Sequence, residues 1–240
     1  GKIDVQGPDA AEFLNRVYVN PFLKVPVGKA RYGVMLREDG YLFDDGTSWR
    51  LSENQFLMTT TTANAASVLS ELERLLTLVW PNLKVHVSSV TDQWAGMAVA
   101  GPKSRDVLVK IIDDIDFSEK GLPHMAIADG RIGNIPVKVA RLSFSGERAY
   151  EIYTGTSHGK AVWEALIESG NPYNIVPYGT EALSTLRIEK GHISGPELDG
   201  RTTMNDVGLG KMASEKKQYI GSVLSKRDGL VAKNRKKMVG

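Results

Sequence analysis

Two adjacent acids, Asp44 and Asp45, follow an apolar triplet in the stretch GYLFDDGTSWR. A carboxylate withdrawn from water binds its proton more tightly, and it can then act as a general acid or base near neutral pH. Acids in tandem also occur in solvated turns, where they have no chemical role. The position of the nearest turn therefore decides between a hairpin tip and a buried carboxylate.

The turn is predicted to come before the acid pair. The segment RYGVMLREDGYLFDDGTSWRLSENQFLMTTT predicts three strands, with turns at residues 38–40 and 52–54. Asp44 and Asp45 then lie inside the middle strand and point to opposite faces of a sheet. Because Asp is uncommon in strands, we expect at least one of the two to face the interior, and periodicity does not say which.

A second candidate is Glu151, in the segment RLSFSGERAYEIY. Its neighbours Tyr150 and Ile152 share one face of the predicted strand, so Glu151 is on the other. It is either an exposed residue of a half-solvated strand or a carboxylate that accepts hydrogen bonds from a flat ligand. Further along, Arg187 and Glu189 are either surface charges of a helix or, for Arg187, part of a buried ion pair.

Composition excludes several kinds of site. The chain of 240 residues is 42% hydrophobic, which suffices for one large domain or two smaller ones. It has no cysteine, which rules out disulfides, thiolate catalysis and cysteine-based metal sites. Its four histidines lack the spacing of a zinc site, so no metal is expected.

No targeting or membrane segment is recognisable. No apolar run is long enough to cross a membrane, and the first residues do not have the architecture of a signal peptide. The chain begins without Met, inside a predicted strand. We therefore expect a piece of a longer polypeptide that is cytoplasmic and has no membrane partner.

Charge is uneven along the chain. Residues 211–240 hold nine of the 30 Lys and Arg but only two of the 28 Asp and Glu. A basic tail can bind nucleic acid. After Tyr219, however, no aromatic residue interleaves with these cations, so a base-stacking surface is not expected. A solvated face or a linker explains the tail better, and we predict no nucleic-acid partner.

A strand, a Gly-Pro pair and an amphipathic helix occur twice, in IDVQGPDAAEFLNRV and MAVAGPKSRDVLVKI. Strands followed by helices within each half favour an α+β fold over a doubly wound parallel sheet. We expect two similar lobes of antiparallel sheet and helices, at residues 1–90 and 91–210. Further helices are predicted at residues 63–79, 158–169 and 180–190, the last two ending at Gly170 and Gly191.

Several segments resemble the folate-binding aminomethyltransferase family, which includes the T-protein of the glycine cleavage system. GKARYGVMLREDGYLFDDGTSWRLSENQFLMTTTTANA, AVAGPKSRDVL, RLSFSGERAYEIY and LRIEKGHISGPELDGRTTMNDVGLG match the family's motifs in order and spacing, from end to end. Within the family, GKIDVQGPDAAEFLN and PYGTEALSTLRIEKGH are most similar to the C-terminal portion of heterotetrameric sarcosine oxidase α subunits. The resemblance implies two lobes around a folate pocket and, at residues 211–240, the start of a truncated C-terminal β-barrel.

The resemblance also implies roles for single residues. Asp45 corresponds to the carboxylate near the reactive nitrogens of tetrahydrofolate, and it is the implied catalytic residue. Glu151 corresponds to the carboxylate that recognises the pterin ring. The implied folate-binding set is Asp45, Glu151, Tyr32, Phe144 and Tyr150. Asp44 is then a solvated or hydrogen-bonded neighbour.

The implied activity is transfer of a one-carbon unit. Oxidative demethylation of sarcosine supplies the unit, and its transfer to tetrahydrofolate gives 5,10-methylenetetrahydrofolate. Tetrahydrofolate is the implied cofactor of this chain, whereas FAD, FMN and NAD are expected only in parts outside it. The implied partners are folate and the other subunits of a hetero-oligomeric oxidase.

Single residues argue against two other functions that occur within the same fold. An aminomethyltransferase of the glycine cleavage system is disfavoured because Leu183 stands where that group has a ligand-binding arginine, and because the chain begins without Met. A non-enzymatic folate-binding protein is disfavoured because residues 217–221 read KQYIG and lack the cysteine of that group's K-G-C-Y-x-G-Q motif.

Overall fold

A five-stranded antiparallel sheet, ordered β2-β3-β4-β1-β5, is the centre of a first unit made of residues 1–90 and the chain from Ile193 onward. The structure is a computed structural model that describes residues 1–239. The predicted turns at 38–40 and 52–54 are confirmed, because β3 begins two residues after Gly40 and ends at Ser52. The strands are β1 (Lys2–Gln6), β2 (Lys29–Leu36), β3 (Leu42–Ser52), β4 (Gln55–Thr59) and β5 (His86–Ser89).

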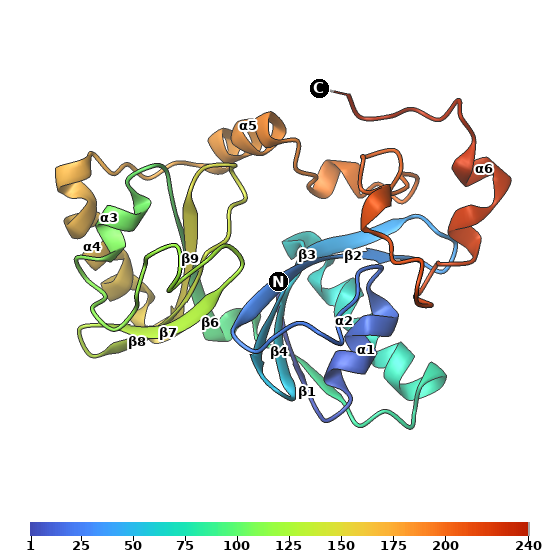
Figure 1. The fold of residues 1–240 in the computed structure, drawn as a ribbon, viewed down its shortest axis with the longest axis horizontal. Coiled ribbons are helices and arrows are strands. Elements are labelled where there is room, and N and C mark those ends of the chain that lie inside the picture. Colours follow the sequence, from blue (N-terminus) through green and yellow to red (C-terminus); the bar gives the residue numbers. More distant parts are fainter. Residues whose placement is uncertain (240) are drawn as a thin grey trace. The chain divides into compact units, whose positions relative to one another are not determined.

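Two helices cover one face of this sheet (Figure 1). They are α1 (Ala10–Val17) and α2 (Ala65–Arg74), and α2 continues as a π-helical turn at Leu75–Val79. Their apolar stripes explain the placement, because Phe13 and Leu14 of α1 and Leu72 of α2 are fully buried against the sheet.

The chain from Ile193 onward covers the other face. Ile193, Met204 and Val207 pack against Val34 and Leu42 of the sheet. The sequence analysis grouped residues 193–210 with the second lobe, whereas here they pack on the first sheet. In the described part of residues 211–240 no strand forms, so the start of a β-barrel stays a prediction. That segment contains α6 (Asp228–Val231).

The second unit, Thr91–His192, has a four-stranded antiparallel sheet ordered β6-β9-β8-β7. Its core joins the sheet to α3 and α4, through residues such as Leu108, Ile152 and Leu166. The elements are β6 (Trp94–Ala100), α3 (Ser104–Leu108), β7 (Ile127–Ile132), β8 (Ile135–Ala140), β9 (Ala149–Gly155), α4 (Gly159–Gly170) and α5 (Thr180–Lys190). Short 3₁₀ turns lie at Thr62–Asn64, Thr91–Gln93, Thr156–His158, Asn171–Tyr173, Gly195–Glu197, Gly210–Met212 and Leu224–Lys226.

The two sheets with their helices confirm the α+β prediction, and the repeated strand–glycine–helix unit is present in both units. Gly7 links β1 to α1 and Gly101 links β6 to α3, each with a positive φ that favours glycine. Gly191 ends α5 in the left-handed conformation, as predicted. Helix α4 also ends at Gly170, as predicted, but Gly170 itself keeps a helical backbone instead of the left-handed one, and a side chain there would collide with Ile175.

Candidate functional site

Asp44 and Asp45 lie on opposite faces of β3, as predicted. Asp45 pairs with Val34, whose side chain belongs to the cluster under Ile193, and Asp44 pairs with Met35, which packs under α1 and α2. Both acids are buried, with exposed fractions of 1% for Asp44 and 9% for Asp45. The sequence required only one of them to face inward, and both do because both faces of the sheet are covered.

Asp45 is joined to Tyr32, another residue of the implied set. The Tyr32 hydroxyl donates a hydrogen bond to Oδ2 of Asp45 over 2.7 Å. Burial raises the pKa of Asp45, the bond from Tyr32 partly opposes this rise, and the charge of Glu197 adds to it. Burial and the charge of Asp45 in turn raise the pKa of Tyr32, so the phenol stays protonated and remains a donor.

Asp44 is hydrogen-bonded rather than solvated. It accepts from the Thr61 backbone N–H at 3.2 Å and from Nδ2 of Asn64 at 3.3 Å. Asn64 also donates to the carbonyl of Phe43 at 3.0 Å, which fixes its amide group. Burial raises the pKa of Asp44 to about 6 although these bonds oppose the rise. Of the two descriptions given for Asp44, the solvated one is wrong and the hydrogen-bonded one is confirmed.

The sequence analysis missed two polar neighbours of this acid pair. Tyr18, which is 1% exposed, follows α1 and is close enough for the charges of Asp44 and Asp45 to raise its pKa, although burial is the larger cause. Tyr18 gives no sequence signal because a tyrosine at a helix end is usually part of the core. Asn64 lies in TTTTANA, at the end of the first resembling segment, and could have been found there.

Burial raises the pKa of both acids, so each binds its proton more tightly than an exposed Asp does. In the part of the chain that the structure describes, no Lys, Arg or His forms an ion pair with Asp44 or Asp45. Two buried carboxylates without a cation favour their protonated forms, and each also disfavours ionisation of the other. Such groups can accept or donate a proton where an exposed Asp would stay ionised.

In the second unit, Glu151 lies in β9 and is half-buried. The Tyr153 hydroxyl donates a hydrogen bond to its Oε2 over 3.1 Å. Its partners on the adjacent strands are Ala98 and Ala140. Because alanine side chains are short, they leave space above the sheet next to the carboxylate. A flat group could lie there and donate hydrogen bonds to Glu151.

Two other residues of the implied set lie apart from Glu151 in this unit. Tyr150 points to the opposite face of β9, is completely buried, and packs its ring edge-on against Phe117 at 5.6 Å. Its side chain therefore belongs to the core and offers no surface to a ligand. Phe144 is 36% exposed, in the loop after β8, with its ring 4.8 Å from that of His192.

Arg187, whose role the sequence left open, is buried. Its exposed fraction is 8%, and its Nη1 donates to the carbonyl of His192 at 3.2 Å. This bond is made just beyond the C-terminus of α5, so Arg187 helps to close that helix. Leu183 lies on the same helix and is half-buried.

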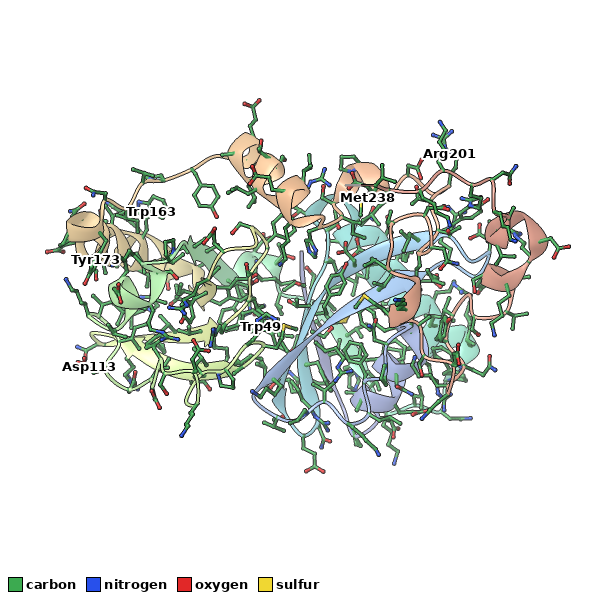
Figure 2. The ribbon with its side chains drawn as sticks, turned by 45° about the horizontal axis from the view of Figure 1, so that its top comes forward. Trp49, Asp113, Trp163, Tyr173, Arg201 and Met238 are labelled. Carbon is green, nitrogen blue, oxygen red and sulfur yellow. The ribbon has the colours of Figure 1, made fainter. Side chains whose placement is uncertain are left out.

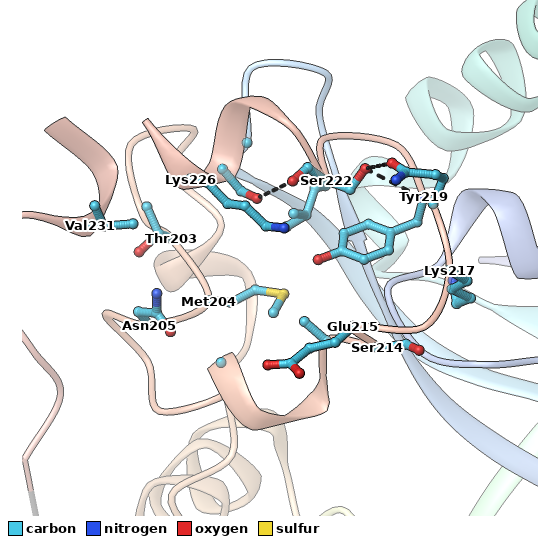
Figure 3. A pocket seen from close by; sticks show the side chains of 16 residues that line it. Thr203, Met204, Asn205, Ser214, Glu215, Lys217, Tyr219, Ser222, Lys226 and Val231 are labelled. Atoms are coloured by element: carbon cyan, nitrogen blue, oxygen red, sulfur yellow. Dashed lines mark hydrogen bonds between the residues drawn. The ribbon is translucent and has the colours of Figure 1, made fainter. Parts of the chain in front are cut away.

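Two cavities lie away from these carboxylates. One of about 230 Å³ in the first unit is lined mainly by the chain from Thr203 to Val231, and Figure 3 shows Tyr219 and Lys226 at its wall. One of about 630 Å³ in the second unit is apolar, with Trp163 and Tyr173 among its lining residues (Figure 2). Neither is lined by Asp45 or Glu151, so the folate pocket stays a prediction.

Among the described residues, no cluster of His, Asp and Glu is arranged to hold a metal ion. The same part of the chain contains no helix that is both long and apolar enough to span a membrane.

Comparisons with known proteins give a consistent result. Residues 1–217 match the sequence profile of the family described as the GCVT N-terminal domain. The chain is 51% identical to a sarcosine oxidase subunit alpha of Rhizobium meliloti (strain 1021), over all of this chain and 24% of that protein. It is 34% identical to an aminomethyltransferase of Streptomyces avermitilis, over 98% of this chain and 62% of that protein.

A solved structure shows the same fold. The crystal structure of glycine cleavage system aminomethyltransferase T from Bartonella henselae superposes with a TM-score of 0.78 at 23% identity, covering 93% of this chain and 59% of that one. The chain thus spans about a quarter of the sarcosine oxidase subunit and about three-fifths of the aminomethyltransferases to which it is similar.

Proposed function

The chain belongs to the GCVT N-terminal domain family, and we propose that it is the tetrahydrofolate-binding part of a sarcosine oxidase α subunit. In this proposal the one-carbon unit released by oxidative demethylation of sarcosine is passed to tetrahydrofolate as 5,10-methylenetetrahydrofolate. The identity of 51% to a sarcosine oxidase subunit over the whole chain supports this choice over the aminomethyltransferases at 34%. FAD, FMN and NAD would bind outside this chain, and the remaining subunits of the oxidase would be its partners.

The observation that carries the proposal is the buried pair of Asp45 and Tyr32. Tetrahydrofolate supplies the nucleophilic nitrogens when it is bound, and a nitrogen that forms a new bond to carbon must lose a proton. Asp45 has no cation partner among the residues that the structure describes, and burial raises its pKa, so it can take up that proton and hold it. Tyr32 keeps one carboxylate oxygen fixed, which leaves the other for the ligand.

Glu151 has the second role in the proposal. Its carboxylate accepts two N–H groups of the pterin ring and so fixes the orientation of the ligand, with Tyr153 holding Oε2 in place. Phe144 adds an exposed aromatic surface, whereas the burial of Tyr150 removes it from the proposed set.

The test of Asp45 uses the full oxidase with all its subunits. Asp45→Ala and Asp45→Asn are expected to lower the yield of 5,10-methylenetetrahydrofolate about a hundredfold or more, while sarcosine oxidation continues and formaldehyde accumulates. Asp39→Asn, in the exposed turn before β3, is the matched control and leaves the yield unchanged. An unchanged yield for Asp45→Ala at saturating folate would refute the catalytic role.

The test of Glu151 separates binding from chemistry. Glu151→Gln keeps the size of the side chain but replaces one acceptor oxygen by a donor. We expect weaker binding of 5-formyltetrahydrofolate, by about one to two orders of magnitude for a lost charge-assisted pair, with the maximal transfer rate much less affected. A loss of rate with unchanged affinity would contradict the orienting role.

A further inference from the structure

Three arginines of the second unit converge on one carboxylate, that of Glu119. Arg141 binds both of its oxygens, with Nη1 at 2.6 Å and Nη2 at 3.1 Å. Arg105 donates from Nη2 at 2.7 Å, and Arg148 reaches the same oxygen at 3.5 Å. Three positive charges around one negative charge leave a local excess of two.

The arginines come from separate parts of the fold. Arg105 lies in α3, Arg141 directly follows β8, and Arg148 directly precedes β9. Arg141 and Arg148 are therefore the two ends of the loop 141–148, which connects neighbouring strands. Glu119 ties both ends of this loop to each other and to α3.

The loop is also held internally. The Ser143 hydroxyl donates to the carbonyl of Glu147 at 2.5 Å and accepts from the N–H of Gly146 at 3.0 Å. The ammonium group of Lys190 donates to the carbonyl of Ser143. Phe144 lies within this braced segment and stays 36% exposed. A loop whose ends are fixed presents such a side chain in one position.

Removing the Glu119 carboxylate would change the electrostatics of the loop. The side chains of Arg141 and Arg105 are only 15% and 24% exposed, so water screens their charges incompletely. Without the carboxylate, three guanidinium groups would repel one another at short range. Because Arg141 and Arg148 are the ends of the loop, their separation would loosen it.

We propose that Glu119 is a positioning residue, whose carboxylate gathers Arg105, Arg141 and Arg148 and thereby fixes the loop that presents Phe144. The link to function rests on the proposed folate-binding role of Phe144, whereas the positioning of the loop does not. The inference also makes the three arginines a receptor for a carboxylate. A small carboxylate from solution should occupy the place of a deleted Glu119 side chain.

The experiment compares Glu119→Ala with Asp129→Ala in the full oxidase. Asp129 is the matched control, because it is an exposed acid of the same unit with a single partner, Lys138 at 2.6 Å. Hydrogen–deuterium exchange of the backbone in residues 141–148 is expected to accelerate about three- to tenfold in Glu119→Ala only, as for the loss of a network of partly exposed ion pairs. Added acetate should slow the exchange again in a saturable way, and only in this variant.

Binding of 5-formyltetrahydrofolate is measured on the same proteins. Glu119→Ala is expected to bind about two- to tenfold more weakly, because the variant must order the loop on binding, and acetate should restore the affinity. If Glu119→Ala does not fold, Glu119→Gln, which keeps the size and removes the charge, takes its place, and it is tested by exchange alone because its side chain fills the position that acetate would take. Exchange in residues 141–148 that equals the wild type in the variant tested, or that acetate does not slow in Glu119→Ala, would overturn the inference. Failure of the wild-type protein to bind the folate would instead refute the proposed function.

Discussion

Asp44 and Asp45 in the first unit and Glu119 in the second are carboxylates in opposite environments. The acid pair lies in a sheet covered on both faces, is at most 9% exposed, and has no cation partner in the described chain. The side chain of Glu119 is 59% exposed and binds three arginines. Burial raises the pKa of Asp44 to about 6, whereas hydrogen bonds from Arg141 and Arg105 lower that of Glu119 to about 2.

The difference separates two uses of a carboxylate. An acid with a raised pKa exchanges its proton in the range where enzymes work, and so it suits proton transfer. An acid with a strongly lowered pKa is a permanent anion and suits the fixing of cations. The contrast predicts that pH perturbs the first unit and that salt perturbs the loop of the second.

The largest expected effect that tests this contrast concerns Asp44. Its folded-state pKa of about 6 lies above the ordinary value of 3.8, so its contribution to stability is complete below about pH 4 and is lost as pH rises through 6. Asp44→Asn removes the titration. The difference in unfolding free energy between wild type and variant should therefore change by roughly 3 kcal/mol between pH 3 and pH 8. Chemical denaturation across this range measures it.

Asp39→Asn is the control of opposite sign. The bond from Arg37 lowers the pKa of Asp39, so its contribution is present above the unfolded pKa and is lost on acidification. The stability difference for this variant should thus shrink as pH falls. A parallel pH dependence for the two variants would break the contrast between buried and paired acids.

The next effect in size concerns the hydroxyl of Tyr32. Tyr32→Phe deletes the donor to Asp45 and is expected to cost about 2 kcal/mol at neutral pH, as for other bonds to charged groups. It also removes the bond that opposes the rise of the Asp45 pKa, so the acid limb of the transfer-rate profile should move to higher pH. Tyr18→Phe is the control, since the hydrogen bond that the Tyr18 hydroxyl accepts from Ser48 is long, at 3.5 Å. If the acid limb moved further in Tyr18→Phe than in Tyr32→Phe, Tyr18 and not Tyr32 would be the residue that sets the pKa of Asp45.

The features that could be predicted from the sequence are those that depend on residues close together in the chain. The hairpin turn at Asp39 and Gly40 and the opposite faces of Asp44 and Asp45 follow from turn residues and strand alternation alone. The left-handed conformation of Gly191 after α5 was predictable in the same way, because glycine is the residue that adopts this conformation most readily at a helix end.

What the sequence did not predict depends on residues far along the chain. Asp45 is buried because the chain from Ile193 onward covers its face of the sheet. That segment lies about 150 residues after Asp45 in the sequence, and no local pattern predicts where it packs. Gly170 does end α4, but with a helical backbone instead of the expected left-handed one, and its lack of a side chain is explained by the close packing of Ile175. The cluster around Glu119 was missed because its members are spread over residues 105–148 and each is an ordinary surface charge by itself.

The smallest expected effect tests the second side of the contrast, in the cluster around Glu119. Lysine cannot reproduce the two-pronged bond of arginine, so Arg→Lys changes should lower the thermal midpoint in the order Arg141, Arg105, Arg148, following the distances to the carboxylate. The differences should be clear in dilute buffer and shrink at about 1 M salt, where the screening length falls to roughly 3 Å. Thermal melts at the two salt concentrations measure both the order and its decay. If the thermal midpoints of the three variants kept the same order and spacing at high salt, the arginines would stabilise the fold by packing. Glu119 would then resemble the acid pair, because its ion pairs would contribute little to stability.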